Sequence, residues 1–259
     1  MPVTLGQINI YPIKSCGGIS LQSTKVGRLG LEYDRTWMVV NGWTNEFLSQ
    51  RDYPKLALIK TALVGGELHI NAEGMPTLTT PLSGSNWLRS LQVSVHDDIC
   101  TGLVIGTAAT QWFSEFLGID SAVLVRLPDN PQRAVGNPGF ADAYPLLGIS
   151  EESLADLNVR LAHPVTMDRF RPNLVFKGCE PYDEDKMSLV KMGDVRIQGV
   201  ESCARCRIVT VNQTTADISR EPLRTLATYR RIGNGVKFGR YFASIDEGQI
   251  TVGMTVEGV

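Results

Sequence analysis

The chain has 259 residues, of which 43% are hydrophobic and 20% are charged, and its formal net charge is −2. This composition is ordinary for a globular protein, and the length is sufficient for two domains. Because the two signs of charge nearly cancel, no overall basic field attracts nucleic acid or an anionic membrane, so any anion site must be local. We see neither a leader-like pattern nor an apolar run long enough to span a bilayer, and therefore expect a cytoplasmic protein without membrane contact.

Short strand patterns dominate the chain. They are alternating residues at 3–5, 8–10 and 250–256, and apolar runs at 37–40, 56–59 and 208–211. Gly65 and Gly66 lie between two further runs and predict a tight hairpin turn. Residues 127–145 are rich in Pro, Gly, Asn and Asp, which is typical of a connection between two halves or of an active-site loop.

Helical patterns are fewer. Apolar residues recur at helical spacing over 112–117, and Gly118 follows as a stop signal. A second stripe over 154–161 has Ser150 as its candidate N-cap, and Pro222 fits the start of a third helix. Since the order lacks the regular strand–helix alternation of a parallel sheet, we predict an α+β, β-rich fold with antiparallel, barrel-like sheets.

The cysteines form an odd, scattered set, which argues against a disulfide framework. They are Cys16, Cys100, Cys179, Cys203 and Cys206. Cys203 and Cys206 are flanked by Arg205 and Arg207, and neighbouring cations favour the thiolate, the reactive and metal-binding form. From spacing alone, a structural zinc site, a thioredoxin-like pair and inert thiols stay open. No matching second ligand pair for zinc is visible, and the residues after Cys206 have a strand pattern where a thioredoxin-like pair needs a helix.

Lys14 and Ser15 follow a predicted strand and precede Gly17 and Gly18. An ammonium, a hydroxyl and backbone N–H groups at this spacing can surround a phosphate, although the segment is not a Walker A loop. The simpler interpretation is a glycine-rich turn with an exposed lysine, and the residues alone favour it.

Two further segments offer cations. Arg169 and Arg171 lie two positions apart and would share one side of an extended segment, and Asn173 follows with both a donor and an acceptor. Arg35 enters an apolar strand next to Asp34. The alternatives are an edge strand with solvated arginines and a simple Asp34–Arg35 ion pair. Together with a thiolate, these cations suit one soft metal centre carried on a phosphate-bearing organic group.

Five segments, in this order, resemble the MOSC group of molybdenum-cofactor proteins, especially the mitochondrial amidoxime-reducing components and their bacterial relatives that reduce N-hydroxylated compounds. These are YPIKSCGG, LEYDRTWMVV, FADAYPLLGISEESLADLN, RFRPNLVFKGC and CARCRIVTVNQTT. The resemblance implies an N-terminal β-rich MOSC-associated domain over residues 1–120 and a MOSC β-barrel domain with a few helices over residues 121–259.

The resemblance also implies a molybdenum cofactor, a molybdopterin, bound by this chain. By position in the shared motifs, Cys203 is the molybdenum ligand and the catalytic residue, and Cys206 has no ligand role. The implied cofactor-binding residues are Lys14, Ser15, Arg35, Arg171 and Asn173, with a looser match at Ser150. A helix N-terminus at Ser150 is by its own chemistry an anion site.

The implied activity is reduction of N-hydroxylated compounds: hydroxylamino-purines, amidoximes and hydroxylamines. The chain ends at Val259 without the cysteine set of an iron–sulfur domain, so we expect electrons from a separate ferredoxin-like or flavin partner. We expect no stable nucleic-acid partner and no membrane partner. The alternative is a molybdenum-cofactor carrier or sulfur-transfer module, in which Cys203 or Cys206 carries a persulfide.

Overall fold

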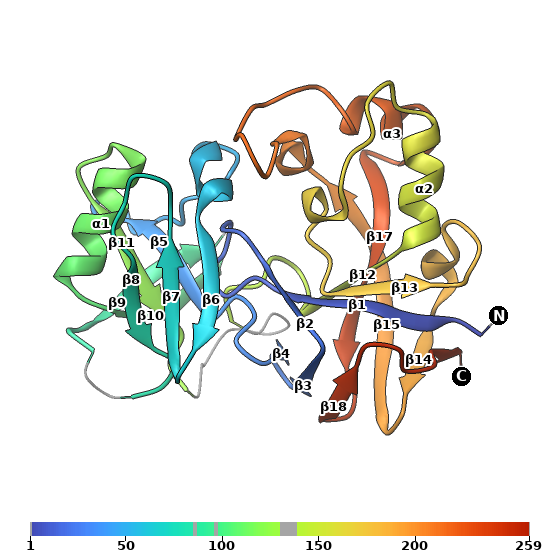
Figure 1. Cartoon of the computed structure of the whole chain (residues 1–259), viewed down its shortest axis with the longest axis horizontal. Helices are drawn as coiled ribbons and strands as arrows, with labels where there is room; N and C mark the ends of the chain where they lie inside the picture. The colour runs from blue at the N-terminus through green and yellow to red at the C-terminus, as the bar shows by residue number, and fades with distance from the viewer. Residues whose placement is uncertain (1, 85–86, 96–97, 130–138, 259) are drawn as a thin grey trace.

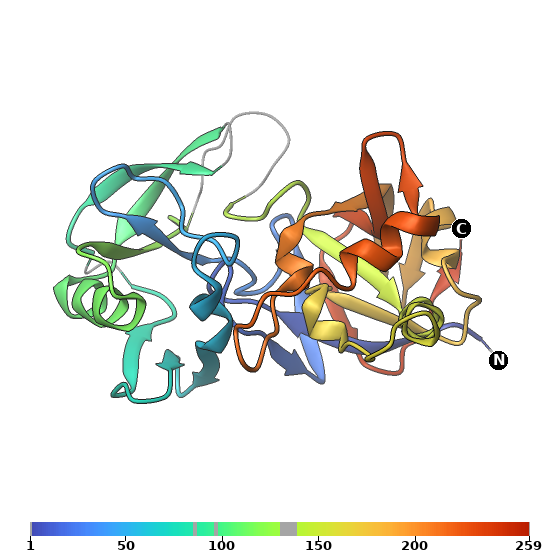
Figure 2. The same ribbon diagram turned by 90° about the horizontal axis from the view of Figure 1, so that it is seen from above.

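The computed structural model describes residues 2–84, 87–95, 98–129 and 139–258. These residues form two lobes that lie side by side, with the N- and C-termini at the same end, as the front view and the view from above both show (Figures 1 and 2). Both lobes are built mainly of β-strands, and the described residues include three α-helices. The predicted α+β, β-rich class is therefore confirmed. Part of the predicted connection, residues 130–138, lies outside the described residues.

The larger lobe is organised around a nine-stranded sheet. Its strands are β1 (Thr4–Ile10), β2 (Ile19–Leu21), β12 (Leu146–Ser150), β13 (Leu174–Lys177), β14 (Leu189–Met192), β15 (Val195–Arg205), β16 (Arg231–Ile232), β17 (Gly235–Ser244) and β19 (Glu257–Gly258). The main path runs β19-β14-β15-β17-β12-β13-β1-β2, and β16 pairs with β17. β1 pairs antiparallel with β13, so the start of the chain completes a sheet made mostly from its second half.

A small three-stranded sheet lies beside this large one. It consists of β3 (Ser23–Gly27), β4 (Gly30–Leu31) and β18 (Gly248–Thr251). β18 pairs antiparallel with β3, which again joins the two ends of the chain. Leu5, Ile8, Phe176, Phe242 and Ile250 are fully buried in the shared core. Leu5 and Ile8 are three positions apart, and a register shift between Leu5 and Gln7 lets both contribute to this core.

The smaller lobe contains two sheets and one helix. Its elements are β5 (Trp37–Asn41), β6 (Lys60–Val64), β7 (Glu67–Asn71), β8 (Leu78–Pro81), β9 (Ser90–Val95), β10 (Asp98–Val104), α1 (Thr107–Leu117) and β11 (Ala122–Arg126). Gly65 and Gly66 have positive φ angles of 59° and 85° between β6 and β7, as the predicted hairpin turn requires. Gly118 ends α1 in the left-handed conformation, as predicted.

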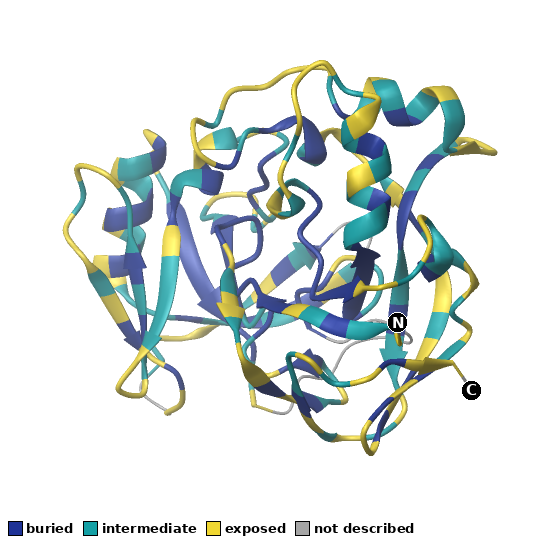
Figure 3. Cartoon of the chain, turned by 45° about the vertical axis from the view of Figure 1, so that its right-hand side comes forward, coloured by how far each residue is buried: buried dark blue, intermediate teal, exposed yellow. Residues whose placement is uncertain are grey.

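The two lobes do not divide at the predicted domain boundary, because each contains strands from both sides of it. β11 follows residue 120, yet it pairs with β5 and with β10 in the smaller lobe. β1, at the other extreme, belongs to the larger lobe. The domain boundary between residues 120 and 121, which the sequence resemblance implied, stays a prediction. Buried residues are concentrated inside the sheets and toward the junction of the lobes, whereas the outer loops are exposed (Figure 3).

Two further helices cover one side of the large sheet. They are α2 (Glu151–Val159) and α3 (Leu223–Tyr229). Ser150 caps α2 by accepting a hydrogen bond from the backbone N–H of Ser153 at 3.0 Å, which confirms the predicted N-cap. Pro222 directly precedes α3, as predicted. Within the described residues, no helix combines the length and the apolar character needed to cross a membrane.

Two short apolar runs do not form the strands that we expected. Residues 54–58 form a 3-10 helix, η1, because Pro54 lacks a backbone donor and suits the first turn of a helix (Pro54–Leu58). Residues 207–210 form η4 (Arg207–Thr210), and the strand lies before them, in β15. Periodicity cannot separate a short buried strand from a short helical turn, which explains both errors. Two other 3-10 turns are η2 (Met167–Arg169) and η3 (Asp183–Lys186).

Candidate functional site

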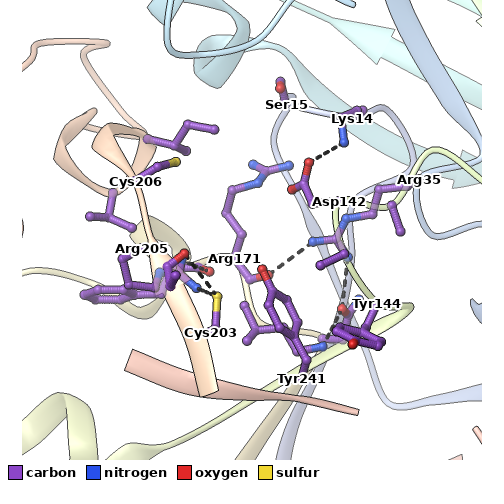
Figure 4. Close-up of a pocket in the computed structure, with 18 of the residues that line it drawn as sticks. Lys14, Ser15, Arg35, Asp142, Tyr144, Arg171, Cys203, Arg205, Cys206 and Tyr241 are labelled. Carbon is purple, nitrogen blue, oxygen red and sulfur yellow. Dashed lines mark hydrogen bonds and ion pairs between the residues drawn. The ribbon is translucent and has the colours of Figure 1, made fainter. Parts of the chain in front are cut away.

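A cavity of about 360 Å³ lies where the two lobes meet. Its lining includes six residues singled out in the sequence, which are Lys14, Ser15, Arg35, Arg171, Asn173 and Cys203. Lys14 and Ser15 follow β1, Arg35 precedes β5, and Cys203 lies in β15. Figure 4 shows the sulfur of Cys203 on one side and the side chains of Lys14 and Arg35 on the other. The fold therefore gathers residues from both lobes around one space.

The sulfur side of the cavity is formed by the last residues of β15. Cys203 is only 2% exposed, and Arg205 donates a hydrogen bond from Nη1 to its Sγ at 3.0 Å. Arg205 is itself fixed by a second bond, from Nη2 to the carbonyl oxygen of Phe170 at 2.6 Å. Burial works to lower the pKa of Arg205, but the neighbouring Cys203 sulfur works against it and the pKa is raised. The Arg205 guanidinium therefore stays charged beside the buried sulfur.

Cys206 differs from Cys203 in its surroundings. It lies just beyond β15, it is exposed, and it also lines the cavity. Nowhere in the ranges that the structure describes do three His, Cys, Asp or Glu side chains come together in a group that could hold a metal ion. The zinc alternative therefore has no ligand set among those residues.

The opposite side of the cavity is cationic. Lys14 is buried, and its Nζ donates to the carbonyl oxygen of Phe140 at 2.8 Å and to Oδ1 of Asp142 at 2.5 Å. Burial lowers the pKa of Lys14, and the Asp142 carboxylate works against that shift. Lys14 is thus a buried cation with one carboxylate partner, and not the exposed surface lysine of the simpler interpretation.

Two arginines pack against one tyrosine ring. The guanidinium carbons of Arg35 and Arg171 lie 4.6 and 4.2 Å from the centroid of the Tyr11 ring. Arg35 also pairs with Asp34 and donates to Oδ1 of Asn173 at 3.0 Å. Burial raises the pKa of Tyr11 to about 12, so its phenol stays neutral next to the two guanidinium groups. Tyr11 therefore positions both guanidinium groups.

Arg171 carries an unsatisfied donor. Its Nη1 donates to the carbonyl oxygen of Cys16 at 2.6 Å, but its buried Nη2 has no hydrogen-bond partner among the described residues. Burial lowers the pKa of Arg171, so its charge lacks sufficient compensation. A buried guanidinium with an open donor is a suitable partner for an anion such as a phosphate.

Three lining residues have backbone conformations that residues other than glycine rarely adopt. Ser15, Arg35 and Arg171 have positive φ angles of 69°, 45° and 56°. Each such residue costs about 1–3 kcal/mol, and these conformations concentrate at ligand and active sites. At Arg171 the conformation also replaces the extended segment that we expected, because η2 ends at Arg169 just before it. Arg169 is not part of the cavity lining.

Asn173 lines the cavity, but its side-chain oxygen and nitrogen form hydrogen bonds to other residues of the chain. Its Oδ1 accepts hydrogen bonds from Arg35 and from the backbone N–H of Leu147 at 3.2 Å. Its Nδ2 donates to the carbonyl oxygen of Asn9 at 3.1 Å. The side chain thus ties β1 to β12 and fixes Arg35.

Ser150 is not part of the cavity lining. Its hydroxyl is buried below α2 and donates to Oε2 of Glu184 at 2.9 Å. The capping bond from Ser153 occupies the same oxygen. The structure thus places Ser150 in the support of α2, and we do not carry it into the proposed site.

Sequence reasoning missed several residues that line or support the cavity. They are Tyr11, Arg51, Asp142, Tyr144, Lys237 and Tyr241. Tyr11, Asp142 and Tyr144 stand inside segments that carry the family resemblance, which is the one signal that could have identified them. The others follow no local spacing rule, because contacts between distant parts of the chain bring them to the cavity.

A two-lobed β-rich fold with this cavity between its lobes defines the class of protein. The chain belongs to the MOSC family: residues 3–120 match the MOSC N-terminal beta barrel domain, and residues 136–257 match the MOSC domain. It is similar to mitochondrial amidoxime-reducing component 1 of Mus musculus, with 36% identity over 96% of this chain and 80% of that protein. The Homo sapiens protein of the same name is 34% identical over 96% of this chain and 81% of its own length. These matches confirm the resemblance seen in the sequence.

A further relative has a different name. The molybdenum cofactor sulfurase of Arabidopsis thaliana is 34% identical over 91% of this chain, but the matched region is only 32% of that longer protein. A region similar to this whole chain therefore occurs within a longer protein that has a different name.

Proposed function

We propose that the chain is a molybdenum-cofactor-dependent reductase of N-hydroxylated compounds, with the cofactor bound in the cavity between the lobes. One observation carries the proposal: a buried thiol beside a guanidinium faces a group of buried cations, one of which has an open donor. The names of the relatives, amidoxime-reducing components and a molybdenum cofactor sulfurase, support the same assignment.

The donor set suits a group that carries both a soft metal and an anion. Cys203 is the proposed metal ligand, since thiolate sulfur is a soft donor. Lys14, Arg35 and Arg171 are the proposed partners of the anionic end, and the open Nη2 of Arg171 provides a donor for it. Ser15 adds a hydroxyl beside Lys14.

When bound, the cofactor supplies the two-electron chemistry that converts an N-hydroxyl compound, two electrons and two protons into the amine and water. The chain supplies position, charge and protons. Burial raises the pKa of the Tyr241 phenol, and the charge of Cys203 raises it further. Tyr241 therefore holds its proton at neutral pH, and its O–H is a donor beside the sulfur. The electrons come, in this proposal, from a separate ferredoxin-like or flavin protein in the cytoplasm.

Metal analysis combined with an assay tests this proposal. The protein is purified from a host that makes the cofactor and from a matched host that cannot make it. We expect molybdenum close to one per chain in the first preparation, little zinc, and reduction of benzamidoxime with a reduced viologen dye as electron donor. The second preparation serves as the control and is expected to be inactive. Zinc without molybdenum in the first preparation, or molybdenum without any reduction, would contradict the proposal.

A sulfur-transfer function remains the second candidate, because Cys206 presents an exposed thiol at the cavity. In that case Cys206→Ala abolishes transfer of radiolabelled sulfur from a persulfide donor, and benzamidoxime is not reduced. The reductase proposal predicts that Cys206→Ala retains most of the reduction. The two assays on one variant therefore separate the two functions.

A further inference from the structure

The cavity contains a pair of aromatic rings that none of the contacts above explains. Tyr144, two residues before β12, packs against Tyr241 of β17 with ring centroids 5.5 Å apart and planes at 43°. Tyr241 lies opposite Leu147 in the sheet, so the strand pairing fixes its place. Both tyrosines line the cavity and are only half-buried. Ring surface therefore remains available to a ligand.

The aromatic pair is chemically distinct from most of the lining. The cations of the lining are Lys14, Arg35, Arg51, Arg171, Arg205 and Lys237. Figure 4 shows the Tyr241 ring on the side of Tyr144 that faces Cys203. Tyr241 also interacts directly with Cys203, which places this ring beside the sulfur. The cavity thus has cations for an anionic group and an aromatic wall near the proposed metal ligand.

We propose that Tyr144 and Tyr241 form a stacking wall that makes the site favour planar, π-conjugated N-hydroxylated compounds over those without a π surface. The inference rests on the proposed function and names the substrate class for the same site. A planar ring stacks on a tyrosine through dispersion and quadrupole interactions, whereas hydroxylamine has no π surface to offer. Tyr144 is the specificity-determining residue, because it contacts the second ring and not the sulfur.

The test compares Tyr144→Ala with Tyr144→Phe in the holoenzyme. Loss of one stacking partner weakens binding of a base by about ten-fold, and phenylalanine keeps the ring while removing only the hydroxyl. We therefore expect Tyr144→Ala to raise the KM for benzamidoxime about ten-fold with a much smaller change in kcat. The ratio of kcat/KM for benzamidoxime to that for hydroxylamine should fall by a similar factor. Tyr144→Phe should keep most of this ratio.

Direct binding gives a readout that needs no turnover. Calorimetric titration of benzamidoxime into the oxidised holoenzyme, without electron donor, should show the same ten-fold weakening in Tyr144→Ala. Trp43→Ala is the matched control, because this 78% exposed ring lies outside the cavity lining. Thermal unfolding of each variant checks that the fold is retained.

The outcomes separate the stacking wall from the proposed function. If wild type binds benzamidoxime more tightly than Tyr144→Ala but reduces no N-hydroxylated compound, the wall stands and the reductase proposal fails. If both compounds are reduced but Tyr144→Ala leaves their ratio unchanged, the wall is wrong and the reductase proposal stands. Absence of benzamidoxime binding to wild type also overturns the wall.

Discussion

Cys203 and Cys206 are three positions apart and have different environments. Cys203 is buried with Arg205 on its sulfur, whereas Cys206 is exposed. Cys203→Ala removes the proposed metal ligand, so we expect loss of molybdenum and of reduction. Cys206→Ala should retain most of both. Elemental analysis and the benzamidoxime assay on both variants check this, and the opposite pattern would show that the ligand is misassigned.

The cations at the other side of the cavity allow a second prediction. Removing a charge-assisted hydrogen bond costs about 1.5–3 kcal/mol, which is about ten- to hundred-fold in affinity. Lys14→Ala and Arg171→Ala should therefore each lower the molybdenum-to-protein ratio while leaving the circular dichroism spectrum unchanged. Arg28→Ala is the control, because Arg28 is exposed and does not line this cavity. Wild-type ratios in both test variants would remove the anion site that we propose.

At the scale of single elements, α2 depends on a buried acid. Glu184 is fully buried, and it accepts hydrogen bonds on Oε2 from the hydroxyls of Ser150 at 2.9 Å and Ser153 at 2.8 Å. Its Oε1 has no partner among the described residues. Burial raises the pKa of Glu184, and the two serine hydroxyls work against this shift without cancelling it. The protonated acid is therefore the form that the fold favours.

The raised pKa of Glu184 predicts the sign with which the free energy of unfolding depends on pH. Because the folded-state pKa is raised, the contribution of Glu184 to stability is fully present below the ordinary glutamate value of about 4.3. It is lost as the pH rises through the raised folded-state value. Glu184→Gln should flatten this dependence, so the stability difference between variant and wild type should shift in favour of the variant with rising pH. Urea unfolding over a pH series measures it, and two parallel curves would contradict it.

The cap of α2 can be separated from the site by one substitution. Ser150→Ala removes an N-cap side chain, which costs about 1 kcal/mol of unfolding free energy, and more if Glu184 is left without a donor. Because Ser150 does not line the cavity, we expect the molybdenum content per folded chain to stay at the wild-type level. Denaturant unfolding and elemental analysis test both parts. A stable variant that lacks molybdenum would restore Ser150 to the binding site.

At the scale of the whole molecule, the cavity joins the two lobes. Lys14 contacts Asp142 across 128 residues of sequence, and Arg207 of η4 pairs at 2.7 Å with Asp52, which lies between β5 and β6. A ligand bound here stabilises the folded chain by an amount that grows with the logarithm of its concentration relative to its Kd, about 4 kcal/mol at a thousand times Kd. For a chain of this size, each kcal/mol raises Tm by about 2–4 °C.

Cofactor-loaded protein should therefore melt at a higher temperature than protein from a host that cannot make the cofactor. Arg171→Ala should reduce the difference between the two preparations, since it weakens the bound state. Differential scanning calorimetry on the four samples measures this. Equal melting temperatures for loaded and cofactor-deficient wild type would mean that the ligand does not bridge the lobes.

The sequence by itself determined the features that depend on local chemistry. The hairpin at Gly65 and Gly66, the end of α1 at Gly118 and the N-cap at Ser150 each follow from the backbone needs of a few adjacent residues. The β-rich class follows from short alternating patterns. The six predicted residues that line the cavity came from the order of family motifs, because no single one of these motifs carries a specific signal.

Only the tertiary structure decided how these parts combine. It placed Cys203 in a strand, turned residues 54–58 and 207–210 into 3-10 helices, and directed Ser150 toward Glu184 and away from the cavity. It also brought Tyr11, Tyr144 and Tyr241 to the site. The physical reason is that periodicity reports only neighbours along the chain. Burial, strand pairing and backbone strain at Arg35 and Arg171 are set by contacts between residues more than a hundred positions apart.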